Sequence, residues 1–65
     1  MSQNDLIAKH LRSGPITPIE ALNRYGVFRL AARVGELRER GLRITTTREQ
    51  RNGKWFAKYW LRAGK

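Results

Sequence analysis

"ITPIEALNRYGVFRLAARVGELRERG", residues Ile16–Gly41, holds two helix signals separated by a glycine. In the first signal, Thr17 can cap a helix and Pro18 suits its first position. Glu20 completes a capping box, in which the cap and the third helical residue bind each other's backbone N–H groups. The pattern predicts a short helix from about Pro18 to Tyr25.

A longer, basic helix is predicted after the glycine. Gly26 predicts a sharp turn, because a left-handed glycine is the most common way to end a helix. Between Val27 and Arg40 the apolar residues Leu30, Val34 and Leu37 recur at helical spacing. We therefore expect a helix over Val27–Arg40 with this apolar stripe turned toward the core.

Another helix is predicted at the start of the chain. Ser2 is a candidate N-cap, Asp5 follows three residues later, and the stretch Ser13–Pro15 ends the helix. One face of this helix carries Leu6, Ile7, His10 and Leu11. A lone histidine on an apolar face is more often a satisfied structural residue than a ligand, and we interpret His10 in this way.

The period of the sequence changes from helical to strand-like after the basic helix. Ile44–Gln50 is rich in threonine, Lys54–Leu61 is rich in aromatic residues, and Asn52–Gly53 is a strong two-residue hairpin signal. With that turn, Ile44 lies opposite Leu61. The register directs one face of the hairpin toward the core, the face of Ile44, Ala57, Tyr59 and Leu61.

Three helices followed by a hairpin predict an α+β fold, a helix-turn-helix with a β-hairpin wing, as one domain over residues 1–65. The stretch Gly14–Ile44 resembles the small helix-turn-helix domains of phage and prophage genes. There a "T-x-x-E-A-L" helix leads through a glycine turn into an "R-L-x-A-R-[IV]-x-x-L-R-x-x-G" helix. "AKYWL", residues 57–61, is similar to the closing "Y-x-L" strand of that family. The resemblance covers roughly Pro15–Leu61.

The resemblance implies sequence-related DNA binding by a small phage or prophage transcriptional regulator or a recombination-directionality factor. The chain departs from the family pattern in one respect. Val27 and Phe28 open the expected third helix, where a polar cap is usual. The base-facing end of this helix is therefore less polar than in typical repressors.

Composition supports an anionic partner. The chain has 65 residues, a formal net charge of +9 and no cysteine. A charge of this size attracts polyanions, which leaves nucleic acid, an anionic membrane surface or an acidic protein as partner classes. No apolar run approaches the roughly 18 residues of a membrane span, and no signal-peptide pattern follows Met1. We expect a protein of the bacterial host cytoplasm.

Two groups of residues are the candidate contacts to double-stranded DNA. The exposed face of the third helix, which would enter the major groove, carries Arg29, Ala32, Arg33, Glu36 and Arg40. The wing, which would lie along phosphates, carries Arg48, Arg51, Asn52, Lys54 and Lys58. The alternatives are an ordinary solvated helix face with Arg–Glu pairs, and lysines that keep an exposed strand from pairing with another chain.

The hairpin has more aromatic residues than a small core can hold. We expect that at least one of Trp55, Phe56 and Trp60 packs against the first helix and that Trp60 or Phe56 stays partly exposed. Core packing or a homodimer contact is the favoured interpretation of these aromatics, and stacking on a nucleobase is the alternative. The hairpin therefore predicts a dimer interface as well as a DNA-contacting wing.

The sequence contains no pattern typical of an enzyme. It has no paired carboxylates, no nucleophile–base set, no metal-ligand cluster and no glycine-rich phosphate loop, and Glu20 is interpreted as a capping residue. We expect no catalysis, cofactor, metal or small-molecule substrate. The competing function is a protein-interaction module, a host-takeover factor or inhibitor, that binds an acidic protein with the same fold. RNA binding is a weaker third hypothesis, because no stacking signature of an RNA module is present.

Overall fold

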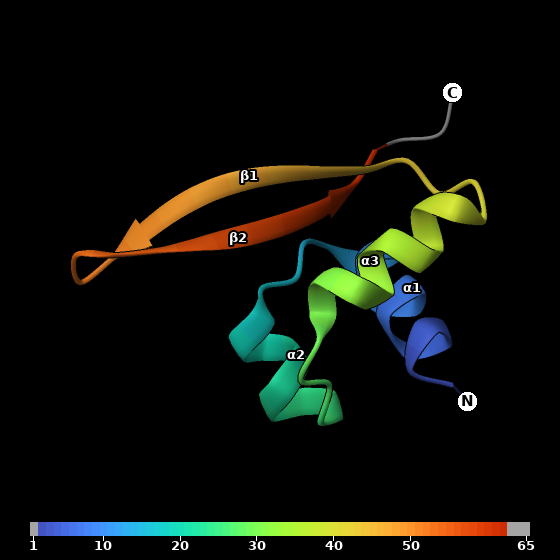
Figure 1. Cartoon of the computed structure of the whole chain (residues 1–65), viewed down its shortest axis with the longest axis horizontal. Coiled ribbons are helices and arrows are strands. Elements are labelled where there is room, and N and C mark those ends of the chain that lie inside the picture. The colour runs from blue at the N-terminus through green and yellow to red at the C-terminus, as the bar shows by residue number, and fades with distance from the viewer. Residues whose placement is uncertain (1, 63–65) are drawn as a thin grey trace.

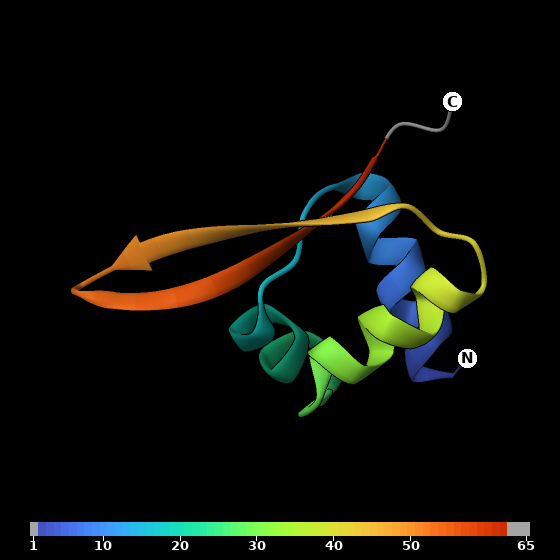
Figure 2. The same ribbon diagram turned by 45° about the horizontal axis from the view of Figure 1, so that its top comes forward.

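The computed structural model describes residues 2–62 and contains three helices followed by a two-stranded antiparallel hairpin. This order confirms the predicted α+β fold, a three-helix helix-turn-helix with a β-hairpin wing. The helices pack together, and the hairpin extends from them so that its tip projects beyond the helical body (Figures 1 and 2). The elements are α1 (Gln3–Ser13), α2 (Pro18–Tyr25), α3 (Leu30–Glu39), β1 (Ile44–Arg51) and β2 (Lys54–Leu61).

Helix α1 begins with the predicted capping box. The Ser2 hydroxyl accepts a hydrogen bond from the Asp5 backbone N–H at 3.1 Å, and the Asp5 carboxylate accepts one from the Ser2 N–H at 3.3 Å. Ile7 and Leu11 are buried, whereas Leu6 is only partly buried. Asn4 is buried as well, which the sequence did not lead us to expect.

The hairpin has the predicted register, with Ile44 opposite Leu61. Asn52 and Gly53 form the two-residue turn and both have positive φ, 53° and 78°, as such a turn requires. Strand β1 continues to Arg51, one residue beyond the predicted end at Gln50. The register therefore decides which side chains share each face of the wing.

A short backbone bridge fixes the hairpin to the helices. Ile16, just before α2, donates its N–H to the Tyr59 carbonyl at 3.0 Å and accepts the Tyr59 N–H at 2.9 Å. This bridge places the second half of β2 beside the start of α2. The end of the hairpin beyond Tyr59, toward the turn, therefore extends past α2 (Figure 1).

Every element contributes to one small core, including the predicted inward residues Ile44 and Tyr59. Ala57 and Leu61, on the same face of the hairpin, are partly buried against it. Burial of this apolar surface holds the helices and the base of the hairpin together. The buried hydrophobic residues are Ile7, Leu11, Ile16, Ala21, Val27, Leu30, Val34, Leu37, Ile44 and Tyr59.

Candidate nucleic-acid interface

Helix α2 and its C-terminal turn set the position of α3. The N-cap Thr17 accepts the Glu20 N–H through its hydroxyl at 3.3 Å, and the Glu20 carboxylate accepts the Thr17 N–H at 3.1 Å. At the other end, Gly26 is left-handed, with φ 67°, and donates its N–H to the Leu22 carbonyl at 2.9 Å. Both ends of α2 were predicted from local sequence, and both are confirmed.

Helix α3 begins at Leu30, three residues later than predicted. Val27 is 1% exposed and donates its N–H to the Ala21 carbonyl at 3.1 Å, so it is held in the core at the end of α2. The chain leaves helical geometry there, and Arg29 is the N-cap, with φ −117° and ψ 65°. Val27 and Phe28 therefore belong to the turn, and the predicted helix Val27–Arg40 was too long at its start.

The N-terminus of α3 differs from those of α1 and α2. Those two helices have capping boxes, whereas Arg29 makes no side-chain capping hydrogen bond and the first turn of α3 has no acidic residue. Within residues 2–62, Arg29 forms no salt bridge. The guanidinium of Arg29 is exposed at the end of α3 that would approach DNA first in a helix-turn-helix.

Away from the core, α3 presents mostly small and acidic side chains. These exposed or partly exposed residues are Ala31, Ala32, Gly35, Glu36 and Glu39. Two of the predicted contacts, Ala32 and Glu36, are among them. Small side chains let a helix approach another surface closely, and a glutamate can accept a hydrogen bond from the cytosine N4 amino group.

Arg33 lies at the flank of α3 beside α1, and not on the fully exposed face that we expected. Its side chain is 28% exposed and forms an ion pair with Glu36 at 3.1 Å. The other oxygen of that carboxylate accepts a hydrogen bond from the Asn4 side-chain amide of α1 at 2.9 Å. The buried Arg33 Nε and Asn4 Oδ1 have no partner within the described residues. A contact from the same Arg33 nitrogen to a base would compete with its ion pair to Glu36.

The remaining arginines of α3 point to different sides of the molecule. Arg38 donates to the Ile44 carbonyl at 2.8 and 3.1 Å and to the Thr46 hydroxyl at 2.9 Å. Arg40 is the C-cap and is exposed. Hydrogen bonds with Ser2 lower the pKa of Asp5, and the positive charge of Arg40 adds to this effect. Arg40 therefore lies near the start of α1, at the opposite end of α3 from Arg29.

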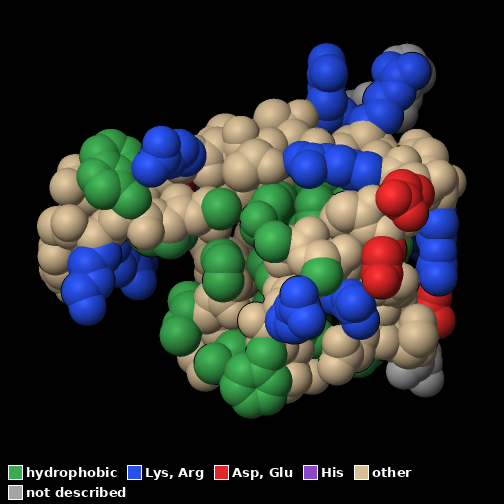
Figure 3. Space-filling model, viewed as in Figure 1, with side chains coloured by type: hydrophobic (Ala, Val, Ile, Leu, Met, Phe, Trp, Pro, Cys, Tyr) green, Lys and Arg blue, Asp and Glu red, His purple; other side chains and the backbone are tan. Residues whose placement is uncertain are grey.

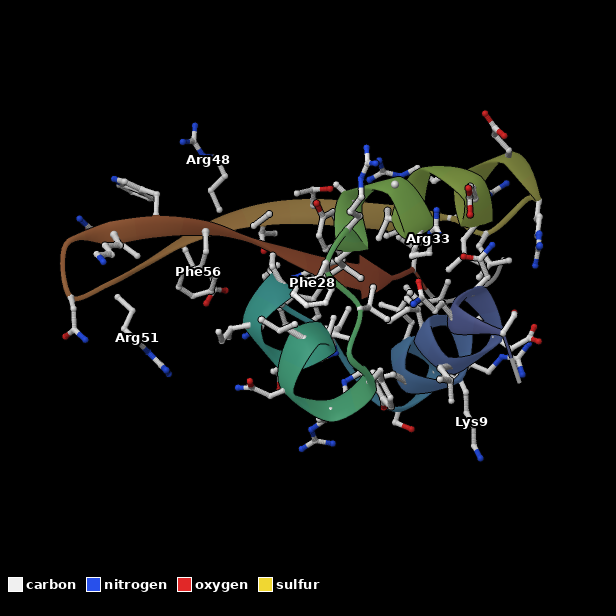
Figure 4. The ribbon with its side chains drawn as sticks, turned by 60° about the horizontal axis from the view of Figure 1, so that its bottom comes forward. Lys9, Phe28, Arg33, Arg48, Arg51 and Phe56 are labelled. Atoms are coloured by element: carbon white, nitrogen blue, oxygen red, sulfur yellow. The ribbon has the colours of Figure 1, made fainter. Side chains whose placement is uncertain are left out.

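The predicted basic residues of the wing occupy both of its faces. Arg48 lies over the Trp55 ring, 5.6 Å from its centre, and points away from the helices, whereas Arg51 points to their side (Figure 4). Lys58 lies over the Trp60 ring at 5.1 Å and forms an ion pair with Glu49 at 3.6 Å. A single flat surface cannot contact all of these cations together.

A groove between α2 and the hairpin brings several candidate residues together. We call it the α2–hairpin groove; among its lining residues are four predicted contacts, Arg51, Asn52, Lys54 and Lys58. Hydrophobic side chains lie along the hollow between the hairpin and the helices (Figure 3). The apolar lining residues are Pro18, Ile19, Leu22, Phe28, Trp55 and Phe56. Phe28 also lines a smaller adjacent hollow with Arg29, Ala31 and Ala32.

The sequence prediction missed two exposed apolar residues beside the candidate contacts, Ile19 and Phe28. Phe28 is 83% exposed and Ile19 is 60% exposed, on the helical side of the groove. A signal for Phe28 was present, since it lies near the expected start of the third helix, where a polar cap is usual. For Ile19 the short amphipathic pattern of α2 contains no signal that separates an exposed apolar residue from a buried one.

None of the three hairpin aromatics in question is part of the buried core, so the core-packing alternative is wrong for them. Trp55 is 60% exposed, Trp60 is 38% exposed and Phe56 is partly buried. The core aromatic of the wing is Tyr59, because the register places it on the inward face and its backbone bridge to Ile16 holds that part of β2 against the helices. The Trp60 indole N–H donates to the Thr47 hydroxyl at 2.9 Å, which satisfies its polar atom on the exposed face.

The one histidine, His10, is held by hydrogen bonds within the fold. The two ring nitrogens of His10 lie 2.8 Å from the Tyr25 hydroxyl and 3.0 Å from the Pro15 carbonyl oxygen, so both are hydrogen-bonded. Within residues 2–62, no three or more His, Asp or Glu side chains gather closely enough to hold a metal ion. Among the described helices, none has the length and apolarity needed to cross a membrane.

Comparison with known proteins gives one match. A family model described as a winged helix-turn-helix domain matches residues 2–63, nearly the whole chain. No curated protein and no solved structure matches significantly. The match agrees with the order of elements and with the turn between α2 and α3.

Proposed function

This chain belongs to the winged helix-turn-helix domain family, and on that basis we propose that it binds double-stranded DNA, with α3 in the major groove and the hairpin along the phosphate backbone. Domains of this family are typically DNA-binding modules without enzymatic activity. The family match over residues 2–63 is the observation that carries the proposal. The net charge of +9 supports it, because phosphate neutralisation supplies much of the affinity of such domains.

The proposed contacts divide into two groups. Arg29, Ala32, Arg33, Glu36 and Arg40 lie on α3 or at its two caps, and the wing contributes Arg48, Arg51, Asn52, Lys54 and Lys58. Arg29 is the strongest candidate of α3, because it is exposed at the N-terminal end and free of salt bridges within residues 2–62. In the wing, Arg51 and Lys54 lie opposite each other on the two strands, next to the turn, and both are exposed. They are the residues best placed to lie along phosphates.

The proposed biological role is that of a small phage or prophage transcriptional regulator or recombination-directionality factor, acting in the bacterial host cytoplasm as one domain. This part rests on the resemblance of the α2–α3 sequence to such domains. One module of this size makes a limited interface with DNA, so tight binding requires dimers or paired sites. The exposed Trp60 and Trp55 of the hairpin are the candidate contacts of a homodimer.

The test is the salt dependence of binding to duplex DNA. Fluorescence anisotropy of a labelled random duplex at several salt concentrations gives the slope of log affinity against log salt. A DNA-binding domain with several phosphate contacts gives a slope of about −0.9 for each contact, and we expect a steep slope. Absence of measurable affinity for any duplex at low salt contradicts the proposal.

The second candidate function is binding of an acidic protein. The observation in its favour is the apolar, basic-rimmed α2–hairpin groove, since exposed apolar patches often mark protein contacts. This hypothesis predicts weak affinity for duplexes of every sequence and capture of an acidic protein by the folded domain. The salt titration separates the two functions before any partner is identified.

A further inference from the structure

We propose that Phe28 reads the C5-methyl groups of thymine in the major groove, together with Ala31 and Ala32 at the N-terminal end of α3. This inference rests on the proposed DNA binding and specifies what the helix recognises. Phe28 is the most exposed of the large hydrophobic residues in the described part of the chain, at 83%. The base-contacting end of a recognition helix is its N-terminal end, which begins two residues after Phe28.

The turn holds the Phe28 side chain outward. Its neighbour Val27 is buried and its N–H binds the Ala21 carbonyl, while left-handed Gly26 fixes the direction of the chain before it. Phe28 cannot turn into the core unless Val27 leaves it. The exposure of this aromatic ring is therefore a property of the turn itself, and it does not depend on a flexible end of the chain.

The charges around Phe28 favour a polyanion as the molecule that covers it. Figure 4 shows Phe28 at the start of α3, on the side of the hairpin toward which Phe56 and Arg51 point. Arg51, Lys54 and Lys58 line the same groove, and Arg29 lines the adjacent hollow with Phe28. An apolar ring bordered by cations is complementary to a surface that is anionic overall and carries apolar groups.

The major groove of DNA offers this combination. Its edges carry phosphates, and among the four bases the thymine C5-methyl is the distinctive apolar group on the groove floor. Ala31 is exposed, Ala32 is partly exposed, and both line the hollow beside Phe28. Alanine and phenylalanine side chains are suited to contact this methyl group. The three residues thus form an apolar surface at the end of α3. A helix that recognises bases by hydrogen bonds would carry polar side chains there.

The experiment compares thymine with deoxyuracil, which lacks only the methyl group. A site is first selected from random duplexes with the wild-type protein, and each thymine of that site is then replaced in turn by deoxyuracil. Affinity is measured by fluorescence anisotropy. We expect a loss of about threefold to fivefold at one or two positions, the size expected for one methyl group removed from an apolar contact.

The variant Phe28→Ala tests which residue makes the contact. It should bind the thymine site more weakly and lose the difference between thymine and deoxyuracil at those positions, as a double-mutant cycle requires. Ile19→Ala is the matched control, because Ile19 is an exposed apolar residue of the same groove but belongs to α2. It should keep the full difference between the two bases. Circular dichroism checks that both variants are folded.

The outcomes separate this inference from the proposed function. Steep salt-dependent binding that is insensitive to deoxyuracil at every position overturns thymine reading and leaves DNA binding intact. No binding to any duplex contradicts DNA binding, and the inference falls with it. If Phe28→Ala keeps both affinity and methyl dependence but sediments at a lower mass than wild type, Phe28 is a protein contact and its assignment here is wrong.

Discussion

The guanidinium group of Arg38 in α3 donates two hydrogen bonds to the carbonyl oxygen of Ile44, the first residue of β1, at 2.8 and 3.1 Å. The same guanidinium binds the Thr46 hydroxyl at 2.9 Å. These contacts join the second half of α3 to the base of the wing. The connecting residues 40–43 are neither helix nor strand. The Arg38 contacts therefore help to hold α3 and the wing, the two parts of the proposed DNA interface, in a fixed orientation.

Arg38→Ala should therefore destabilise the fold. Hydrogen bonds that involve a charged group contribute more than neutral ones, and for this partly exposed set we expect a loss of about 1–2 kcal/mol in the free energy of unfolding. Thermal denaturation followed by circular dichroism measures it. Arg40→Ala is the control, since an exposed residue without such contacts should change stability by less than about 0.5 kcal/mol. Equal stability of the two variants contradicts the structural role of Arg38.

Thr17→Ala tests the capping box of α2. The substitution removes the hydroxyl that accepts the Glu20 N–H, and we expect a cost of about 1 kcal/mol, the usual loss of an N-cap. For a domain of this size that loss lowers the melting temperature by roughly 4–8 °C. A melting temperature unchanged within the error of the measurement shows that the cap contributes nothing to the folded state.

Arg33→Ala tests a specific contact of α3. The ion pair with Glu36 is worth only a few tenths of a kcal/mol at this spacing, so Arg33 can exchange it for a guanine edge. If it does, the substitution should cost about 1–3 kcal/mol of binding to a selected site. Arg12→Ala, at an exposed arginine of α1, is the control. An affinity within threefold of wild type removes Arg33 from the interface.

Lys54→Ala and Lys58→Ala test the wing. Each lost phosphate contact should weaken specific and random duplexes alike and reduce the salt slope by about one. We expect the clearer effect at Lys54, because Lys58 already pairs with Glu49 and lies over Trp60. Anisotropy titrations at several salt concentrations give both slopes. Unchanged slopes in folded variants indicate that the wing points away from DNA.

Trp60→Ala tests the proposed homodimer. The side chain is 38% exposed and lies outside the core, so the variant should stay folded. If Trp60 contacts a second copy, the variant sediments as a smaller species and binds paired DNA sites with less cooperativity. A folded variant of the same mass as wild type rules out this dimer contact. Loss of the helical signal gives Trp60 a role within the fold instead.

Local sequence determined the order of the elements and most of the places where they begin and end, but not the start of α3. The capping residues Ser2 and Thr17, the left-handed Gly26 and the turn at Asn52–Gly53 each act over a few residues, so a single stretch of sequence is enough to predict them. The hairpin register followed from the turn, and with it the burial of Tyr59. These predictions are confirmed because neighbouring residues supply the interactions on which they depend.

Tertiary structure alone decided which of the predicted contact residues are free to meet a binding partner and which are already bound within the fold. Val27 is buried in the core, so α3 begins only at Leu30 and the side chain of Phe28 is exposed. Glu36 binds both Arg33 and Asn4, although Asn4 is 32 residues away in the sequence. Helical periodicity assigns a side chain to a face, but it contains no information on the partner that another element brings to that face. Ion pairs and grooves are made between elements, and their geometry exists only once the core has set how those elements pack.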